Sequence, residues 1–222
     1  MSRSLLYGML VVVLVVMVVV VVVCCTHRSN PNPTVDNMLI DASARIREEL
    51  QRIPSTLITS KGRKKNDWGG GIPKEIMELH QQKTGWIQAW STRNDSVNPD
   101  WLNFGLVIGG RNVGLNCELC PFTMSVLSRI KGLVTAGFSW LRPGALIGKH
   151  TDYLSDTNET VHLGLIVPSG ECFLSVYEDD KTITTHEEEN DKVIHFNSRK
   201  PHWAVNFSDT DRIILYLDIE KG

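Results

Sequence analysis

Hydrophobic positions follow three different patterns along this chain. Residues 5–25 form an apolar run without a charged side chain, long enough for a helix to cross a hydrocarbon core about 30 Å thick. Residues 36–52 repeat apolar positions at helical spacing, which predicts an amphipathic helix. From residue 85 onward, short apolar runs alternate with turns. The pattern therefore predicts a membrane anchor, a helical stem and a mainly β domain.

The domain that follows residue 85 is expected to consist of many short strands. One helix is expected over 121–131, and strands over 103–108, 134–141, 161–167, 172–177, 192–197, 202–206 and 213–219. Turn residues such as Pro143-Gly144 separate these runs. Strands that follow one another without intervening helices are typical of a β-sandwich or jelly roll.

These patterns also suggest the domain boundaries. We expect a short tail (1–4), a transmembrane anchor (5–25), a spacer with stem helices (26–84) and the β-rich domain (85–222). A second stem helix is expected after Pro73, because proline suits a first helical turn. In the first stem helix, the charged side chains are expected to face water: Arg45, Arg47, Glu48 and Glu49.

The apolar run could instead belong to a cleaved signal peptide. Signal peptides usually have a shorter apolar region that ends in small residues, and Val22-Val23-Cys24-Cys25 fits that poorly. An uncleaved anchor is therefore favoured. Arg3 and Arg28 nearly balance the positive-inside rule. Because a folded domain follows the anchor, we expect a type II protein with a lumenal or extracytoplasmic domain.

Composition narrows the possible partners and the role of the cysteines. The net charge of −2 gives no general electrostatic reason to bind nucleic acid. Cys117 and Cys120 form a lone C-x-x-C motif, but a zinc site would need two further ligands. A structural disulfide or two plain thiols are the alternatives. Cys172 is expected in the core of a strand.

Three residues have the chemistry of a mononuclear iron site. A non-haem Fe(II) oxygenase holds its metal with two imidazoles and one carboxylate, leaving positions open for a co-substrate and dioxygen. His150 and Asp152 are two residues apart, so on a strand they would share one face. His202 would supply the third ligand. A His-x-Asp motif is weak evidence alone in a chain with seven histidines.

Arg212 makes this combination more specific. 2-Oxoglutarate has a second carboxylate, which a bidentate arginine binds well. Arg212 follows His202 by one loop and opens an apolar strand. An unpaired arginine in such a dry pocket would be costly. A bound dicarboxylate would remove that cost.

Residues 117–219 resemble the aspartyl/asparaginyl β-hydroxylase family of Fe(II)/2-oxoglutarate-dependent dioxygenases. The matching motifs are Cys120-Pro121, 138–144, the His150 motif, 162–168, 196–198, 202–206 and Arg212. The resemblance implies a double-stranded β-helix (a jelly roll, cupin-like) with flanking helices. It also implies that His150 and His202 bind iron, that Arg212 binds 2-oxoglutarate and that His162 lies against this co-substrate.

The chain departs from the family at two positions of the expected site. Animal members of the family have glycine where this chain has Asp152. At this position the site is more similar to that of the bacterial branch of the family. Family members commonly carry arginine at the position of Thr160.

The resemblance implies hydroxylation of aspartyl or asparaginyl side chains of polypeptides, with a lipid or small molecule at the membrane as the alternative. A non-catalytic jelly-roll binding module is the second alternative, and the oligomeric state stays open.

The remaining marked residues are given ordinary structural interpretations. Trp140 and Trp203 are expected in the core or in pocket walls, and His186 and His195 in exposed or structural positions. Residues 187–189, three glutamates, are expected in a solvated loop.

Overall fold

The computed structural model describes residues 34–55, 57–58, 85–90, 97–152, 158–179 and 181–220. The chain divides into two units, Met1–Thr34 and Val35–Gly222, and the fold below is that of the second unit. None of the helices in the described ranges is both long and apolar enough to cross a membrane. The anchor predicted over 5–25, Cys24, Cys25 and the second stem helix lie outside these ranges.

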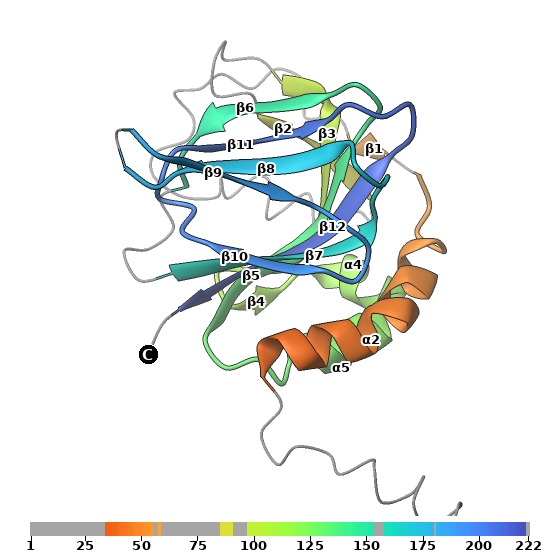
Figure 1. Ribbon diagram of the computed structural model, residues 1–222. Coiled ribbons are helices and arrows are strands. Elements are labelled where there is room, and N and C mark those ends of the chain that lie inside the picture. Colours follow the sequence, from red (N-terminus) through yellow and green to blue (C-terminus); the bar gives the residue numbers. More distant parts are fainter. Residues whose placement is uncertain are drawn as a thin grey trace, which may run out of the picture. The chain divides into compact units, whose positions relative to one another are not determined.

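The described strands form two sheets that face each other (Figure 1). The larger has the order β1-β2-β3-β5-β12-β7-β10, with β4 paired to β3, and the smaller has the order β6-β11-β8-β9. The larger sheet contains β1 (Leu57–Ile58), β2 (Trp86–Trp90), β3 (Val97–Ile108), β4 (Arg111–Asn112), β5 (Leu133–Leu141), β7 (Asn158–Ile166), β10 (Val193–Phe196) and β12 (Arg212–Glu220). The smaller sheet contains β6 (Leu146–His150), β8 (Cys172–Tyr177), β9 (Ile183–Glu187) and β11 (His202–Asn206). This is the predicted mainly β, jelly-roll architecture.

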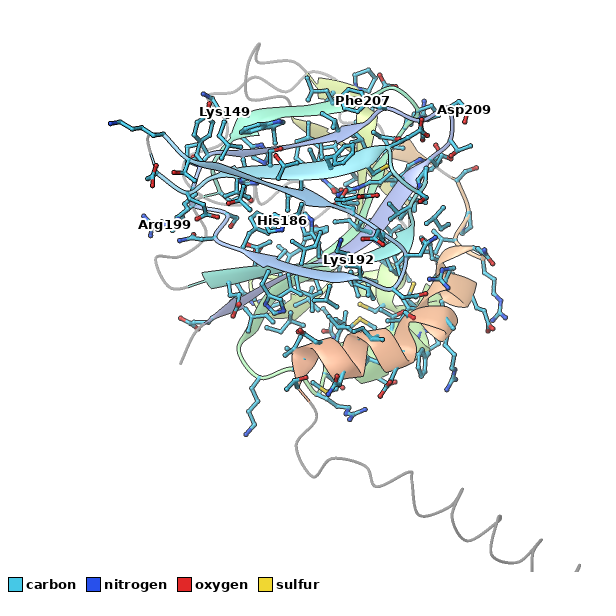
Figure 2. All side chains as sticks on the ribbon, in the orientation of Figure 1. Lys149, His186, Lys192, Arg199, Phe207 and Asp209 are labelled. Carbon is cyan, nitrogen blue, oxygen red and sulfur yellow. The ribbon has the colours of Figure 1, made fainter. Side chains whose placement is uncertain are left out.

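Alternation along the strands separates a helix-covered core from the space between the sheets. On β12, Leu215 and Leu217 belong to the main core, whereas Arg212, Tyr216 and Asp218 line a cavity on the opposite face. Successive residues of a strand point to opposite faces. The apolar residues of β12 therefore stabilise the sheet, and its polar residues are free to build a site. Figure 2 shows the side chains of both sheets directed into the space between them.

The described residues of this unit also form three helices: α2 (Val35–Leu50), α4 (Gly114–Leu119) and α5 (Pro121–Leu127). In Figure 1, α2 and α5 lie side by side below the larger sheet. Leu39, Ile46 and Leu50 of α2 are buried in the main core. The first stem helix is thus confirmed as a helix. It belongs to the core of the same compact unit, so the predicted boundary at residue 85 does not separate it from the β domain.

The prediction that the charged residues of this helix face water is wrong for Glu49. Its carboxylate is buried and accepts hydrogen bonds from the backbone N–H groups of Phe122 and Thr123, both at 2.7 Å, and from the Thr123 hydroxyl. These amides belong to the first turn of α5, where a helix leaves its N–H groups without internal partners. Glu49 therefore caps α5 and ties it to α2. Arg47 is half-buried and pairs with Asp191.

Each predicted strand has an observed counterpart, but five of the described strands were not predicted. These are β1, β2, β4, β6 and β9, and β3 begins at Val97, well before the expected Asn103. Cys117 and Cys120 are free thiols, the second of the two alternatives. Cys172 is buried in β8 as expected.

Candidate metal centre and its cavity

The ends of β6 and β11 bring the two predicted histidine ligands together. His150 is the last residue of β6, His202 is the first of β11, and the two are direct cross-strand partners. Their ring centroids lie 4.2 Å apart. Oδ1 of Asp152 lies 3.8 Å from Nε2 of His150, and Oδ2 of Asp152 lies 3.7 Å from Nε2 of His202. The ligand atoms of these three residues all lie within 4.8 Å of one another, so they could hold one metal ion.

Asp152 reaches this cluster from a different local structure than predicted. β6 ends at His150, so the two residues do not share a strand face as ligands. Instead, the backbone N–H of Asp152 donates to the carbonyl of Ser198 at 2.9 Å. That bond holds the segment after β6 against the loop that precedes β11. Asp152 thus lies in the candidate cluster, but the segment after β6, held by this hydrogen bond, positions its carboxylate.

Hydrogen bonds orient both imidazoles for metal binding. Nδ1 of His150 lies 2.8 Å from the carbonyl of Gly148, and Nδ1 of His202 lies 2.9 Å from the carbonyl of Lys200. A carbonyl can only accept, so each ring is assigned a proton on Nδ1 and a lone pair on Nε2. Burial, with the neighbouring His150, lowers the pKa of His202 to about 3. A neutral imidazole is the form that ligates a metal.

The cluster opens into a cavity of about 350 Å³ between the sheets. The cavity lining combines the three candidate ligands with polar residues of the larger sheet. It includes Trp101, Asn103, Thr135, Ser139, Thr160, His162, Phe196, Arg212, Tyr216 and Asp218. The ring of Phe196 contacts both His162 and His202, with centroids 4.9 and 5.2 Å apart. All five predicted site residues therefore line one cavity.

Arg212 is buried as predicted, but it is not unpaired. Its Nε donates to Oε2 of Glu188 at 2.8 Å, and its Nη2 donates to Oε1 of the same carboxylate. Glu188 is 1 % exposed, so its predicted place in a solvated loop is wrong, whereas Glu187 and Glu189 are exposed. Burial opposes ionisation of Glu188, but Arg212 and His162 outweigh it and lower its pKa to about 2. His162 Nδ1 lies 3.4 Å from this carboxylate.

Gly164 explains how Glu188 can approach Arg212. A Cβ atom at residue 164 would lie 1.9 Å from the carbonyl oxygen of Glu189. The backbone N–H of Gly164 donates to Lys192, and its carbonyl accepts from Asp191. A side chain at this position would push the segment after β9 away from β7. Gly164, in the motif that begins at His162, therefore allows Glu188 to lie beside Arg212.

The opposite end of β12 carries a second buried carboxylate, which sequence reasoning missed. Asp218 is 5 % exposed, and its Oδ1 accepts a hydrogen bond from the Thr160 hydroxyl at 2.7 Å. Burial raises the pKa of Asp218 to about 6, and the charge of Asp152 adds to this effect. A signal was present in the sequence, because Asp218 shares the strand parity of Arg212. No comparable signal marked Glu188, which lies in a run of three glutamates.

Comparison with known proteins assigns a family to this fold and cavity. The family model described as "Aspartyl/Asparaginyl beta-hydroxylase" matches residues 65–222. The chain belongs to this family. The chain is also 31 % identical over 149 residues to an ornithine lipid ester-linked acyl 2-hydroxylase of Rhizobium tropici. It is 33 % identical over 97 residues to the aspartate beta-hydroxylase domain-containing protein 2 of Xenopus tropicalis.

The chain matches only part of the length of each of these two relatives. The matches cover 66 % of the chain and 52 % of the Rhizobium protein, and 40 % of the chain and 25 % of the Xenopus protein. A solved structure of a 2OG-Fe(II) oxygenase family oxidoreductase from Burkholderia pseudomallei superimposes with a TM-score of 0.51 at 12 % identity. That match covers 67 % of this chain and 78 % of the other, and it supports the same fold.

Proposed function

We propose that this chain is a Fe(II)/2-oxoglutarate-dependent dioxygenase that hydroxylates its substrate. The observation that carries the proposal is the cluster of His150, Asp152 and His202 in one cavity with Arg212. Two imidazole nitrogens and a carboxylate oxygen are the ligand set of non-haem Fe(II) oxygenases, so the residues present fit this metal. Family membership and the fold support the same class.

Each residue of the cluster has a defined task in this proposal. His150, Asp152 and His202 would hold Fe(II), which supplies dioxygen activation for hydroxylating a C–H bond while 2-oxoglutarate becomes succinate and carbon dioxide. The carbonyls of Gly148 and Lys200 fix the two imidazole rings. Such outer hydrogen bonds orient metal ligands and fix their tautomers. Phe196, between His162 and His202, shields the rings from water.

Arg212 would bind the distal carboxylate of 2-oxoglutarate with the edge that Glu188 leaves free. A guanidinium has five N–H donors, and Glu188 accepts from Nε and Nη2. The Nη1 side can therefore serve a second carboxylate. In this arrangement Glu188 is a positioning residue, because it fixes the plane of the guanidinium. His162 would lie against the same co-substrate.

The substrate is proposed from the relatives and from the cavity. Aspartyl or asparaginyl side chains of polypeptides are one candidate class. A lipid is the other, because the matched Rhizobium protein is named as an ornithine lipid hydroxylase. Mass spectrometry of peptides and of membrane lipids after incubation would separate the two, by a gain of one oxygen atom.

Membrane attachment through residues 5–25, with the domain on the lumenal or extracytoplasmic side, is part of the proposal. It is supported by the length and apolar character of that run. Alkaline extraction of membranes would release the protein if the run is no anchor. Protection from added protease in sealed vesicles would test the orientation.

The decisive test of the activity is binding followed by turnover. The full chain is titrated anaerobically with Fe(II) and then with 2-oxoglutarate, and succinate is measured after oxygen is admitted. We expect His202→Ala to lose Fe(II) binding and succinate formation, while His186→Ala, which removes a histidine outside the cavity, retains both. A chain that binds Fe(II) without His202, or that never forms succinate, would favour a non-catalytic binding module.

A further inference from the structure

Three residues on neighbouring strands form a polar row in the wall of the cavity that the candidate metal ligands also line. Thr135 on β5 is the cross-strand partner of Asp218 on β12, and Asp218 is the partner of Thr160 on β7. The three side chains are at most 5 % exposed and line the cavity. Cross-strand partners lie side by side on one face of a sheet. They are therefore a contiguous patch of the cavity wall, called here the Thr135–Asp218–Thr160 row.

The hydrogen-bonding capacity of this row is largely unused inside the protein. An ionised carboxylate has about four acceptor sites, and among the described residues Asp218 receives one side-chain hydrogen bond, from Thr160. Among the residues that the structure describes, the buried Thr135 hydroxyl has no hydrogen-bond partner. Buried polar groups are nearly always paired, and leaving one unpaired costs about 1–3 kcal/mol. Two neighbouring groups with spare acceptors thus face the same cavity.

The charges that surround the cavity determine which ligand groups this row could bind. Arg212 is the sole arginine or lysine among the described residues that line the cavity, and its charge is balanced by Glu188. No positively charged side chain in the described part of the chain pairs with Asp218. An incoming carboxylate would meet a like charge at the row, whereas an N–H or O–H group would meet acceptors. Like charges in a buried site repel strongly.

The row is also separate from the proposed co-substrate site. Arg212 and Asp218 are six residues apart on β12, which corresponds to about 20 Å along a strand. 2-Oxoglutarate held by Arg212 would therefore leave the row to another molecule. In a dioxygenase that other molecule is the substrate to be hydroxylated.

We propose that the Thr135–Asp218–Thr160 row is a substrate subsite that binds a hydrogen-bond-donating group, an ammonium, amide N–H or hydroxyl, and excludes carboxylates. This inference rests on the proposed dioxygenase function and deepens it, because it names the substrate chemistry. A donor would satisfy both the spare oxygen sites of Asp218 and the Thr135 hydroxyl. Among peptide substrates the row favours an asparaginyl over an aspartyl side chain.

The test uses three probes of matched length: hexylammonium, hexanamide and hexanoate. The full chain is first loaded anaerobically with Fe(II) and 2-oxoglutarate, and each probe is then titrated by calorimetry. We expect the two donors to bind at least about 10-fold more tightly than hexanoate. Failure to load Fe(II) or 2-oxoglutarate counts against the dioxygenase. A loaded protein that binds no probe, or binds hexanoate equally well, overturns the subsite.

Variants separate the subsite from a structural role of the same residues. Asp218→Asn should weaken hexylammonium binding about 10-fold or more, because it removes the negative charge. Thr135→Val should weaken the donor probes roughly 5-fold without lowering stability, because its hydroxyl makes no hydrogen bond within the described part of the chain. Thr185→Val, which removes a hydroxyl bonded to Ser175 on β8, is the matched control and should leave probe binding unchanged. Equal effects of Thr135→Val and Thr185→Val would refute the proposal.

Discussion

A buried carboxylate lies at each end of β12, and the pKa values of the two are shifted in opposite directions. Glu188 lies beside Arg212 at the start of the strand, where the guanidinium and His162 outweigh burial and lower its pKa to about 2. Asp218 lies near the end of the strand, where burial raises its pKa to about 6 and a threonine hydroxyl gives limited compensation. Asp218 lines the cavity, and Glu188 contacts Arg212 and His162, which line the same cavity. Partners, and not burial, therefore determine what each carboxylate does.

This contrast separates a structural pair from an open site. The Arg212–Glu188 pair is closed on itself along one edge and leaves the other edge of the guanidinium for a ligand. Asp218 has no cation of its own in the described chain. Groups that weaken the folded state are retained at functional positions in many proteins. In the proposed function, one end of the cavity holds an anion beside Arg212, and the other end binds a hydrogen-bond donor.

The largest expected effect comes from breaking the pair at the start of β12. Arg212→Met leaves Glu188 buried without its cation, and removing one partner of a buried pair costs roughly 3–5 kcal/mol. We expect a loss of this size in the free energy of unfolding, measured by urea denaturation of the full chain in detergent. The double variant Arg212→Met/Glu188→Gln should recover much of the loss. A double variant no more stable than Arg212→Met would show that Glu188 is not the reason.

The sequence indicated the His150–Asp152–His202 cluster and Arg212 better than it indicated the rest of the cavity. His150, His202 and Arg212 were found because few residue types do their chemistry and because each stands at the edge of an apolar run. The pattern of apolar and polar residues along the chain likewise predicted β5, β7, β11 and β12. Spacing alone could not show that β6 stops at His150 and that Asp152 lies beyond the end of the strand.

Glu188 and Glu49 could not be predicted, because their burial depends on contacts between distant segments. Glu188 is twenty-four residues from Arg212 in the chain, and its approach requires Gly164. Glu49 looks like a solvent-facing position of an amphipathic helix, yet α5 supplies its partners more than seventy residues later. Local pattern describes the element that a residue belongs to, and not the element that packs against it.

The second prediction uses the opposite proton linkage of the two carboxylates. The pKa of Glu188 falls from an ordinary 4.5 to about 2, so its stabilisation is present above pH 4.5 and is lost as pH falls toward 2. The pKa of Asp218 rises from an ordinary 3.8 to about 6, so the folded state loses stability as pH rises from 3.8 to 6. Each effect is on the order of 3 kcal/mol.

Unfolding measured between pH 3 and 7 can resolve these contributions. Asp218→Asn should remove the loss of stability between pH 4 and 6, and Glu188→Gln should weaken the acid-side loss below pH 4.5. The slopes of the two variants should therefore differ from that of the natural chain in opposite directions. Slopes that change in the same direction would contradict the difference between the two ends of β12.

The smallest expected effect concerns Glu49, a third buried carboxylate, which lies outside the cavity. Two backbone N–H groups and one hydroxyl compensate it at the start of α5. Glu49→Gln keeps one acceptor but turns an amide N–H toward a donor, and it removes a charge that favours a helix N-terminus. We expect a loss of about 1 kcal/mol. Hydrogen exchange should show reduced protection at Phe122 and Thr123, with probe binding at the Thr135–Asp218–Thr160 row unchanged. Altered probe binding would mean that α5 and the cavity are coupled, and that burial on one face of the larger sheet is not independent of the other.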